Sequence, residues 1–297
     1  MRRIGNTPLV ELRRIGTGAG VRLFAKLEGL NPGGSVKDRA ARAIVLEARR
    51  RGYLEGRRLL DASSGNTGIA YAMLGAVLGF RVTICLPGSA SSERKRILGA
   101  YGAEVIETDP LEGSDGAIHE ARAIAAREKE RWYYADQYSN PANPAAHEAT
   151  TGPEILRQLG ELRLDLFVAG LGTSGTFVGI SRYLQRASPA TRRVAIEPDG
   201  PLHGLEGLKH MKSALVPSIF EPELAHDRLG VATEDAQAMT RRLAREEGVL
   251  AGVSSGAAVL GALQAARESH ARNVVVVLPD GGDRYLSERF WEEGGDA

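Results

Sequence analysis

The chain has 297 residues, 43% hydrophobic and 25% charged, proportions typical of a soluble globular protein with a substantial core. Its formal charge of +1 argues against nucleic acid or a membrane surface as a partner, and no apolar run reaches transmembrane or signal-peptide form. The single cysteine, Cys85, excludes an intrachain disulfide framework and favours a reducing cytoplasm.

Apolar, strand-like runs alternate with helical patterns almost throughout the chain. Several of these runs are continuously apolar, as expected for strands buried on both faces of a parallel sheet. Strands are predicted at residues 21–28, 57–63, 81–87, 102–108, 164–170, 192–198 and 273–279. Helices are predicted at residues 38–51, 67–79, 92–101, 114–129, 175–186, 234–247 and 256–268. The alternation predicts an α/β protein.

Two segments stand out from this alternation. The polar, turn-rich segment 136–144 is a plausible crossing point between two lobes. Segment 199–230 carries many proline, glycine and histidine residues, and it is predicted to be a loop-rich excursion near a functional site.

One lysine lies in an unusual setting. Only six of the 38 basic residues are lysines, and Lys37 follows the Gly-rich turn 31–34 directly before a predicted helix. Its small neighbours leave room for the side chain to be buried against a ligand. Burial lowers the pKa of a lysine and frees its amine, so Lys37 is a candidate Schiff-base nucleophile. Lys95 and Lys129 lie among charged helical residues and are expected to be solvated.

Three Gly-rich loops each precede a predicted helix, at residues 63–68, 170–176 and 252–256. Backbone N–H groups at a helix N-terminus bind phosphate or carboxylate. Residues 170–175 fit GxGxxG, but no acidic residue follows about 20 positions later, so a dinucleotide site is not favoured. Ordinary strand-to-helix turns would explain any one loop. Three loops together with Lys37 favour a ligand with a phosphate and a carbonyl-bearing ring.

Five ordered motifs carry a family resemblance: NPGGSVKDR, SSGNTG, DQYSNPANP followed by TTGPEI, GTSGT and GVSSGAA. With them, the chain resembles the cysteine synthases, which are pyridoxal phosphate enzymes of the tryptophan-synthase-β fold (fold type II). The resemblance covers essentially the whole chain. LEGLNPGGSVKDRAA and GDRYLS are more similar to the B-type (O-acetylserine sulfhydrylase B) than to the A-type.

The resemblance implies a fold of two lobes with parallel-rich sheets flanked by helices. Residues 35–145 would form a smaller, mobile domain that grips the substrate. Residues 1–34 and 146–297 would form a larger domain that binds the cofactor phosphate. The resemblance also implies a homodimer, and the single cysteine makes the cytoplasm the expected location.

The resemblance also implies roles for single residues. Lys37 would form the internal aldimine with pyridoxal 5′-phosphate, and Asn66 would bond the ring hydroxyl. Ser254 would face the pyridine nitrogen. The phosphate would be held by Gly172, Thr173, Ser174, Gly175 and Thr176. The substrate α-carboxylate would be bound by Ser63, Ser64, Thr67 and Gln137.

The implied reaction is a β-replacement that makes L-cysteine through an aminoacrylate intermediate. The donor would be O-acetyl-L-serine or O-phospho-L-serine, and the sulfur source sulfide or thiosulfate. A neutral Ser254 hydroxyl makes the ring a weaker electron sink, which favours β-elimination over transamination. Cystathionine β-synthase and serine/threonine dehydratase are alternatives on the same fold, although Thr67 stands where dehydratases carry histidine. A non-catalytic binding module is a third possibility.

Three further residues or residue groups lead to predictions. Lys209 lies in segment 203–211, which departs from the A-type pattern; it is either a ligand for an anionic phosphate or thiosulfate or an ordinary loop lysine. The six histidines show no metal-ligand spacing, so no metal is predicted. Cys85, within an apolar strand, is predicted to be a buried core thiol.

Overall fold

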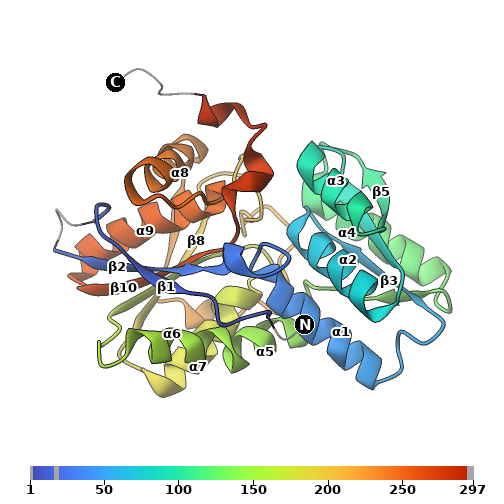
Figure 1. Ribbon diagram of the computed structural model, residues 1–297, viewed down its shortest axis with the longest axis horizontal. Coiled ribbons are helices and arrows are strands. Elements are labelled where there is room, and N and C mark those ends of the chain that lie inside the picture. The colour runs from blue at the N-terminus through green and yellow to red at the C-terminus, as the bar shows by residue number, and fades with distance from the viewer. Residues whose placement is uncertain (1–2, 17–19, 293–297) are drawn as a thin grey trace.

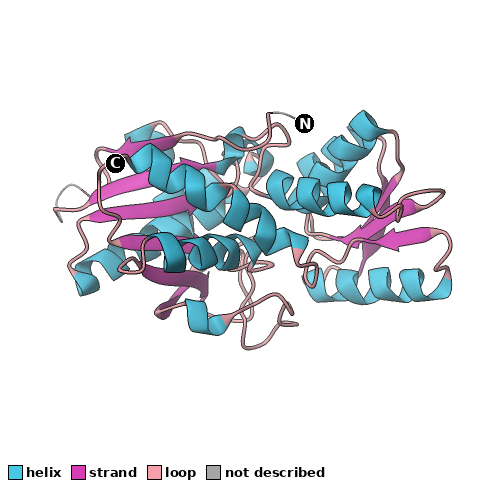
Figure 2. Ribbon diagram, turned by 90° about the horizontal axis from the view of Figure 1, so that it is seen from below, coloured by secondary structure: helices cyan, strands magenta, loops and turns pink. Residues whose placement is uncertain are grey.

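The computed structural model describes residues 3–16 and 20–292, and these contain two β-sheets that are covered by helices on both faces (Figure 1). Figure 2 shows the two sheets in separate bodies that lie side by side. The predicted α/β class is confirmed. No helix among the described residues is long and apolar enough to cross a membrane.

The larger sheet has six strands in the order β1-β2-β10-β7-β8-β9. β1 pairs with β2 in antiparallel fashion, and the other neighbouring strands are parallel. β10 reads NVVVVL and lies inside the sheet, where it is almost completely buried. The strands are β1 (Leu9–Leu12), β2 (Arg22–Leu27), β7 (Leu166–Gly170), β8 (Arg192–Pro198), β9 (Asp227–Val231) and β10 (Asn273–Leu278).

Helices cover both faces of this sheet because its strands are apolar on both sides. α8 and α9 pack on one face, and α5, α6 and α7 lie on the other (Figure 1). The helices are α5 (Ala142–Ala149), α6 (Thr151–Leu159), α7 (Gly175–Ala187), α8 (Thr233–Glu247) and α9 (Val253–Ser269).

The smaller sheet has four parallel strands in the order β5-β4-β3-β6. α2 and α3 pack on one face and α4 on the other. The strands are β3 (Arg58–Ala62), β4 (Val82–Pro87), β5 (Glu104–Thr108) and β6 (Trp132–Tyr134). The helices are α2 (Asn66–Leu78), α3 (Ser92–Ala100) and α4 (Gly113–Arg127).

α1 (Lys37–Arg50) joins the two bodies, since it packs against α2 on one side and α5 on the other. Short 3-10 helices complete the described chain at Glu28–Leu30, Pro222–Leu224, Gly282–Tyr285 and Arg289–Trp291. Each sheet takes its strands from one of the two predicted segment sets: the smaller from 35–145, the larger from 1–34 and 146–297. The mobility and substrate-gripping role of the smaller body stay predictions.

All seven predicted strands and seven predicted helices are present, with ends shifted by a few residues. Sequence analysis missed three short strands, β1, β6 and β9, and two helices, α5 and α6. The predicted crossing at 136–144 is partly helical, because α5 begins at Ala142. Cys85 is fully buried in β4, and burial raises the pKa of its thiol to about 12.

Candidate active site

Lys37 is the first residue of α1, and the turn before it is tied to the carboxyl end of β10. Val36 N–H donates to Pro279 O at 2.7 Å, and Ser35 pairs with Asp280 in an isolated β-bridge. Gly34 has φ +78°, and a side chain there would collide with the Arg284 guanidinium. The Gly-rich turn is therefore required sterically. Burial lowers the pKa of Lys37, although the charge of Asp280 opposes this shift.

The loop after β7 forms a concave, small-residue surface at the N-terminus of α7. A Cβ atom at Gly172 would strike the carbonyl oxygen of Gly207, and one at Gly175 would strike the Asn143 side chain. Ser174 has φ +67°, and its hydroxyl is buried without a hydrogen-bond partner in the part of the chain that the structure describes. An anion at this helix N-terminus would satisfy that hydroxyl.

A small cavity brings together residues that are far apart in the sequence. Lys37, Asn66 and Ser254 line it, together with the loop 172–176 through Gly172, Thr173, Ser174 and Thr176. Ser254 lies at the start of α9 and is 3% exposed. Four separate segments predicted to contact the cofactor thus converge on one space.

A larger cavity of about 510 Å³ shares Lys37 and Asn66 with the small one. It is the place where the predicted carboxylate-binding residues lie, namely Ser63, Ser64, Thr67 and Gln137. Loop 199–216 forms much of its opposite wall, as expected for the loop-rich segment.

Internal hydrogen bonds already occupy several of these polar side chains. The Ser63 hydroxyl accepts from Gly65 N–H at 3.0 Å and Gly68 N–H at 3.1 Å. Thr67 Oγ1 donates to Gln137 Oε1 at 2.6 Å, and Gln137 Nε2 donates to Ala62 O at 2.6 Å. These bonds fix the shape of the loop, so its backbone N–H groups at the start of α2 are the groups best placed for a carboxylate.

The Asn66 amide has two charged partners that sequence analysis missed. Its Nδ2 donates to Asp280 Oδ2 at 2.7 Å, and its Oδ1 accepts from Arg284 Nη1. Tyr285 OH also donates to Asp280 Oδ2 at 2.7 Å. These residues belong to the segment that includes GDRYLS, where the sequence signal contributed to the family resemblance but not to a site. The three side chains set the orientation of Asn66.

Arg94 extends this network to α3 of the smaller body. Its Nη2 donates to Tyr285 OH at 2.7 Å, and its guanidinium lies 4.8 Å from the centroid of the Tyr285 ring. Arg94 also forms an ion pair with Glu206, which lines the larger cavity. The side chain is 2% exposed, so a charged residue of one body is buried against the other.

Lys209 lines the larger cavity and is 4% exposed. Its Nζ forms a short ion pair with Asp115 Oδ1 and lies 5.1 Å from the centroid of the Tyr138 ring. The residue is therefore a buried, paired lysine of the cavity wall rather than a solvated one. Its predicted contact with a substrate anion stays a prediction.

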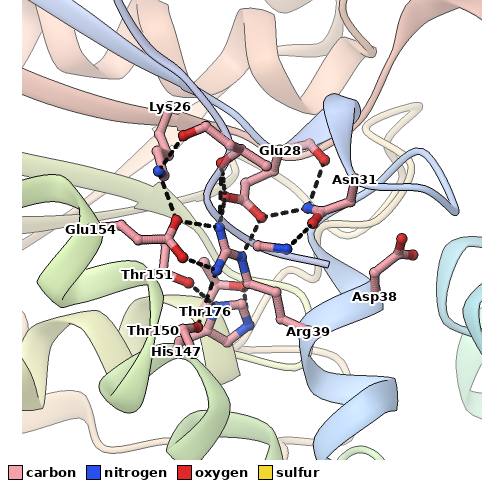
Figure 3. Close-up of polar contacts among 12 residues, drawn as sticks. Lys26, Glu28, Asn31, Asp38, Arg39, His147, Thr150, Thr151, Glu154 and Thr176 are labelled. Atoms are coloured by element: carbon pink, nitrogen blue, oxygen red, sulfur yellow. Dashed lines mark hydrogen bonds and ion pairs between the residues drawn. The ribbon is translucent and has the colours of Figure 1, made fainter. Parts of the chain in front are cut away.

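A buried charge network supports the first turn of α1 (Figure 3). Arg39 donates to both carboxylate oxygens of Glu28, each at 2.8 Å, and to those of Glu154 at 2.8 and 2.7 Å. Lys26 Nζ donates to Glu154 Oε2 at 2.9 Å. Burial raises the pKa of Glu154, but the hydrogen bonds and charge of Arg39, together with hydrogen bonds from Asn6 N–H and Lys26, outweigh it and bring that pKa to about 2. The network fixes the helix that carries Lys37.

His147 contacts Thr176, the last residue of the predicted phosphate loop (Figure 3). Its Nδ1 is 2.9 Å from Thr151 Oγ1, and its Nε2 is 3.3 Å from Thr176 Oγ1. Burial holds the pKa of this imidazole well below its usual value, so the ring is neutral. No group of three or more His, Cys, Asp or Glu within 3–16 and 20–292 is arranged to hold a metal ion.

Comparison with known proteins gives the same assignment from independent data. A family model described as pyridoxal-phosphate dependent enzyme matches residues 1–280. The chain is 44% identical to a cysteine synthase of Aquifex aeolicus, covering 98% of this chain and 91% of that protein. It is 43% identical to cysteine synthase B of Salmonella typhimurium, covering 98% and 95%. The chain therefore belongs to the pyridoxal-phosphate dependent enzymes and, within them, to the cysteine synthases.

Solved structures show the same relationship. A cysteine synthase of Entamoeba histolytica superposes with a TM-score of 0.92 at 35% identity, covering all of this chain and 91% of that one. An O-ureido-L-serine synthase superposes with a TM-score of 0.91 at 36% identity, covering 100% and 95%. The predicted fold and the pyridoxal phosphate cofactor are confirmed.

Proposed function

We propose that the chain makes L-cysteine by replacing the β-substituent of O-acetyl-L-serine with sulfide. The single observation that carries the proposal is the convergence of Lys37, Asn66, Ser254 and the loop 172–176 on one cavity. The cysteine synthase relatives, at 43–44% identity over nearly the full chain, support the substrate class.

The residues present fit pyridoxal 5′-phosphate. The concave loop after β7 leaves no room for side chains at Gly172 and Gly175, and it presents the Ser174 hydroxyl, which has no hydrogen-bond partner among residues 3–16 and 20–292. We propose that this loop, residues 172–176, holds the phosphate at the N-terminus of α7. Asn66 and Ser254 are proposed to contact the ring, and Lys37 is proposed to be the residue of covalent attachment.

When bound, the cofactor supplies a conjugated ring that stabilises negative charge at the substrate α-carbon. Lys37 has a lowered pKa, so its amine is suited to take the proton from that carbon and later return it. The N-terminus of α2, with Ser63, Ser64, Thr67 and Gln137, is proposed to bind the α-carboxylate. Holding the carboxylate beside the amine orients the Cα–H bond toward Lys37.

The neutral Ser254 is proposed to favour loss of the β-substituent over transamination, because a hydroxyl does not hold the ring nitrogen protonated as a carboxylate would. Walls from both bodies and from loop 199–216 surround the larger cavity. They would restrict the entry of water while the β-carbon awaits sulfide.

A donor and acceptor screen tests the function. Purified holoenzyme should convert O-acetyl-L-serine and sulfide to cysteine, with release of one acetate per cysteine. Homocysteine as acceptor would reveal a cystathionine β-synthase, and pyruvate or 2-oxobutanoate formation from serine or threonine would reveal a dehydratase. Absence of cysteine formation with every donor would overturn the proposal.

The finer assignments are part of the same proposal. B-type character, use of O-phospho-L-serine or thiosulfate, and contact of Lys209 with the substrate anion rest on the family resemblance. So do the homodimeric assembly and the cytoplasmic location, the latter supported by one unpaired, buried cysteine. Sedimentation velocity of the holoenzyme tests the assembly: a mass near twice 31.7 kDa is expected.

A further inference from the structure

The ion pair between Lys209 and Asp115 joins the two bodies across the larger cavity. Asp115 lies in the first turn of α4, and Lys209 lies in the loop that follows β8. The Lys209 side chain is 5% exposed and that of Asp115 is 28% exposed. Lys209 N–H also donates to Leu171 O at 2.8 Å, which fixes the base of this lysine beside the predicted phosphate loop.

Both residues line the cavity that contains Lys37. The Lys209 ammonium contacts the Asp115 carboxylate on one side and lies 5.1 Å from the centroid of the Tyr138 ring. Asp115 Oδ2 accepts a further hydrogen bond from Leu215 N–H at 2.8 Å. The carboxylate is thus held in place by two donors of the loop.

The pairing of Lys209 with Asp115 lowers the positive charge that the cavity wall presents to an anion. An unpaired, buried ammonium would bind a dianionic oxyanion strongly through charge-assisted hydrogen bonds. With Asp115 in contact, the charge of Lys209 is compensated, and an approaching dianion meets a like charge beside it. A phosphate ester carries close to two negative charges at neutral pH, whereas an acetyl ester carries none.

We propose that Asp115 is a positioning residue that sets substrate specificity: by pairing with Lys209 it weakens, without abolishing, the binding of substrates that carry a dianionic oxyanion. The two sources of such a group are the phosphate of O-phospho-L-serine and thiosulfate. The inference rests on the proposed function and deepens it, since it concerns the choice at the same site between dianionic substrates and those of lower charge, O-acetyl-L-serine and sulfide.

The test compares kcat/KM values of wild type and Asp115→Asn holoenzyme. One arm uses O-phospho-L-serine against O-acetyl-L-serine, both with sulfide. The other uses thiosulfate against sulfide, both with O-acetyl-L-serine, and the product followed with thiosulfate is S-sulfo-L-cysteine. In D115N the preference for at least one dianion should rise by roughly tenfold, the effect of one charge-assisted hydrogen bond. The gain should appear as a lower KM for the dianion, with kcat for O-acetyl-L-serine little changed. A gain in the first arm identifies the phosphate of O-phospho-L-serine as the disfavoured dianion, and a gain in the second arm identifies thiosulfate.

Three further variants separate charge from structure. Asp115→Glu keeps the carboxylate and should retain the wild-type preference. Lys209→Met, alone or with D115N, should show no gain for dianions. Glu120→Gln removes a carboxylate of the same helix that pairs with Arg127 instead, and it should match wild type. If D115N folds poorly, Asp115→Ala tests the same point.

Isothermal titration calorimetry with inorganic phosphate gives a readout that does not depend on turnover. D115N should bind phosphate roughly tenfold more tightly than wild type, and the double variant with K209M should not. Unchanged phosphate affinity together with unchanged dianion preference in folded D115N would overturn the proposal. Failure of the proposed function would appear separately, as absence of cysteine formation by wild type.

Discussion

Lys37 owes its properties to its neighbours along the chain and across the fold. The small residues before it allow the turn 31–36 to pack against Asp280 and Arg284. Packing leaves Lys37 partly buried in the walls of the two cavities, and desolvation of a lysine favours its neutral form. The carboxylate of Asp280 limits this effect. The result is a lowered pKa, as the proposed roles of this amine in covalent attachment and proton transfer require.

Lys37→Ala should lower cysteine formation by about 10³-fold or more, because both covalent attachment and proton transfer depend on this amine. After borohydride reduction, mass spectrometry of wild type should find the cofactor mass on the peptide that contains Lys37. The variant should carry none. Lys129→Ala, a change in a charged helical stretch, should keep both turnover and label. A label on another lysine, or retained turnover in K37A, would show that the assignment is wrong.

Asp61 gives a prediction about pH. It is fully buried at the end of β3 and accepts hydrogen bonds from Ala62 N–H and Gln137 N–H. Burial raises its pKa to about 8 from 3.8, so the folded protein holds a proton that the unfolded chain releases. The contribution of Asp61 to the free energy of unfolding should therefore decline as pH rises from about 4 to about 8.

Asp61→Asn removes this titration. In urea unfolding at pH 5.5 and pH 8, wild type should lose stability relative to D61N at the higher pH. Asp235→Asn, an exposed change at the start of α8, should follow the wild-type profile. Parallel pH profiles for wild type and D61N would contradict the prediction.

Among the elements, α1 depends most on buried polar contacts. The network of Lys26, Glu28, Arg39 and Glu154 connects β2, α1 and α6 (Figure 3). Removing one member of a buried ion network leaves the other charges buried without a partner. The free energy of unfolding then falls by more than the intact network contributes to it. The position of Lys37 therefore depends on the charge of Arg39, two residues further along the helix, and on the carboxylates that pair with it.

Arg39→Met should lower the free energy of unfolding by about 3 kcal/mol or more, since it leaves Glu28 and Glu154 without their main partner. Chemical denaturation of the variant measures this loss. Arg50→Met is the matched control on the same helix, because the Arg50 side chain is 70% exposed; its effect should stay within about 0.5 kcal/mol. Equal losses in the two variants would refute a special role of the network.

The elements that sequence analysis missed have physical explanations. Asn-Pro-Ala-Asn-Pro and Thr-Gly-Pro resemble turns, yet Pro144 and Pro153 lie in the first turns of α5 and α6, where the missing N–H costs no helical bond. β1, β6 and β9 have three to five residues each. Such short segments become strands because a neighbouring strand offers hydrogen bonds, and local pattern does not reveal that.

In the whole molecule, Arg94 is one of the buried residues that connect the smaller body to the C-terminal part of the larger one. It bonds Tyr285, which bonds Asp280, and Asp280 in turn bonds Asn66. The same arginine pairs with Glu206 of the cavity wall. The relative position of the two bodies and the orientation of Asn66 are thus linked through one chain of hydrogen bonds.

Arg94→Met should raise the KM for O-acetyl-L-serine by roughly tenfold, because a charge-assisted bond that holds the two bodies together beside the proposed donor cavity is lost. Steady-state kinetics with sulfide in excess gives this value. Lys95→Met is the matched control, since Lys95 is the next residue and pairs with Glu107 instead. A KM in R94M equal to that of the control would show that Arg94 does not contribute to donor binding.

The sequence by itself determined the α/β class and most strands and helices. It also singled out Lys37 and the three glycine loops as candidates for the site. Those features follow from local pattern: apolar runs, small residues before a lysine, and glycines at helix starts. Only the tertiary structure decided that Asp280, Arg284 and Tyr285 orient Asn66, that Arg94 is buried across the two bodies, and that Lys209 is paired with Asp115. These contacts join residues 94–218 positions apart, and hydrogen bonds between such distant side chains leave no periodic trace in the sequence.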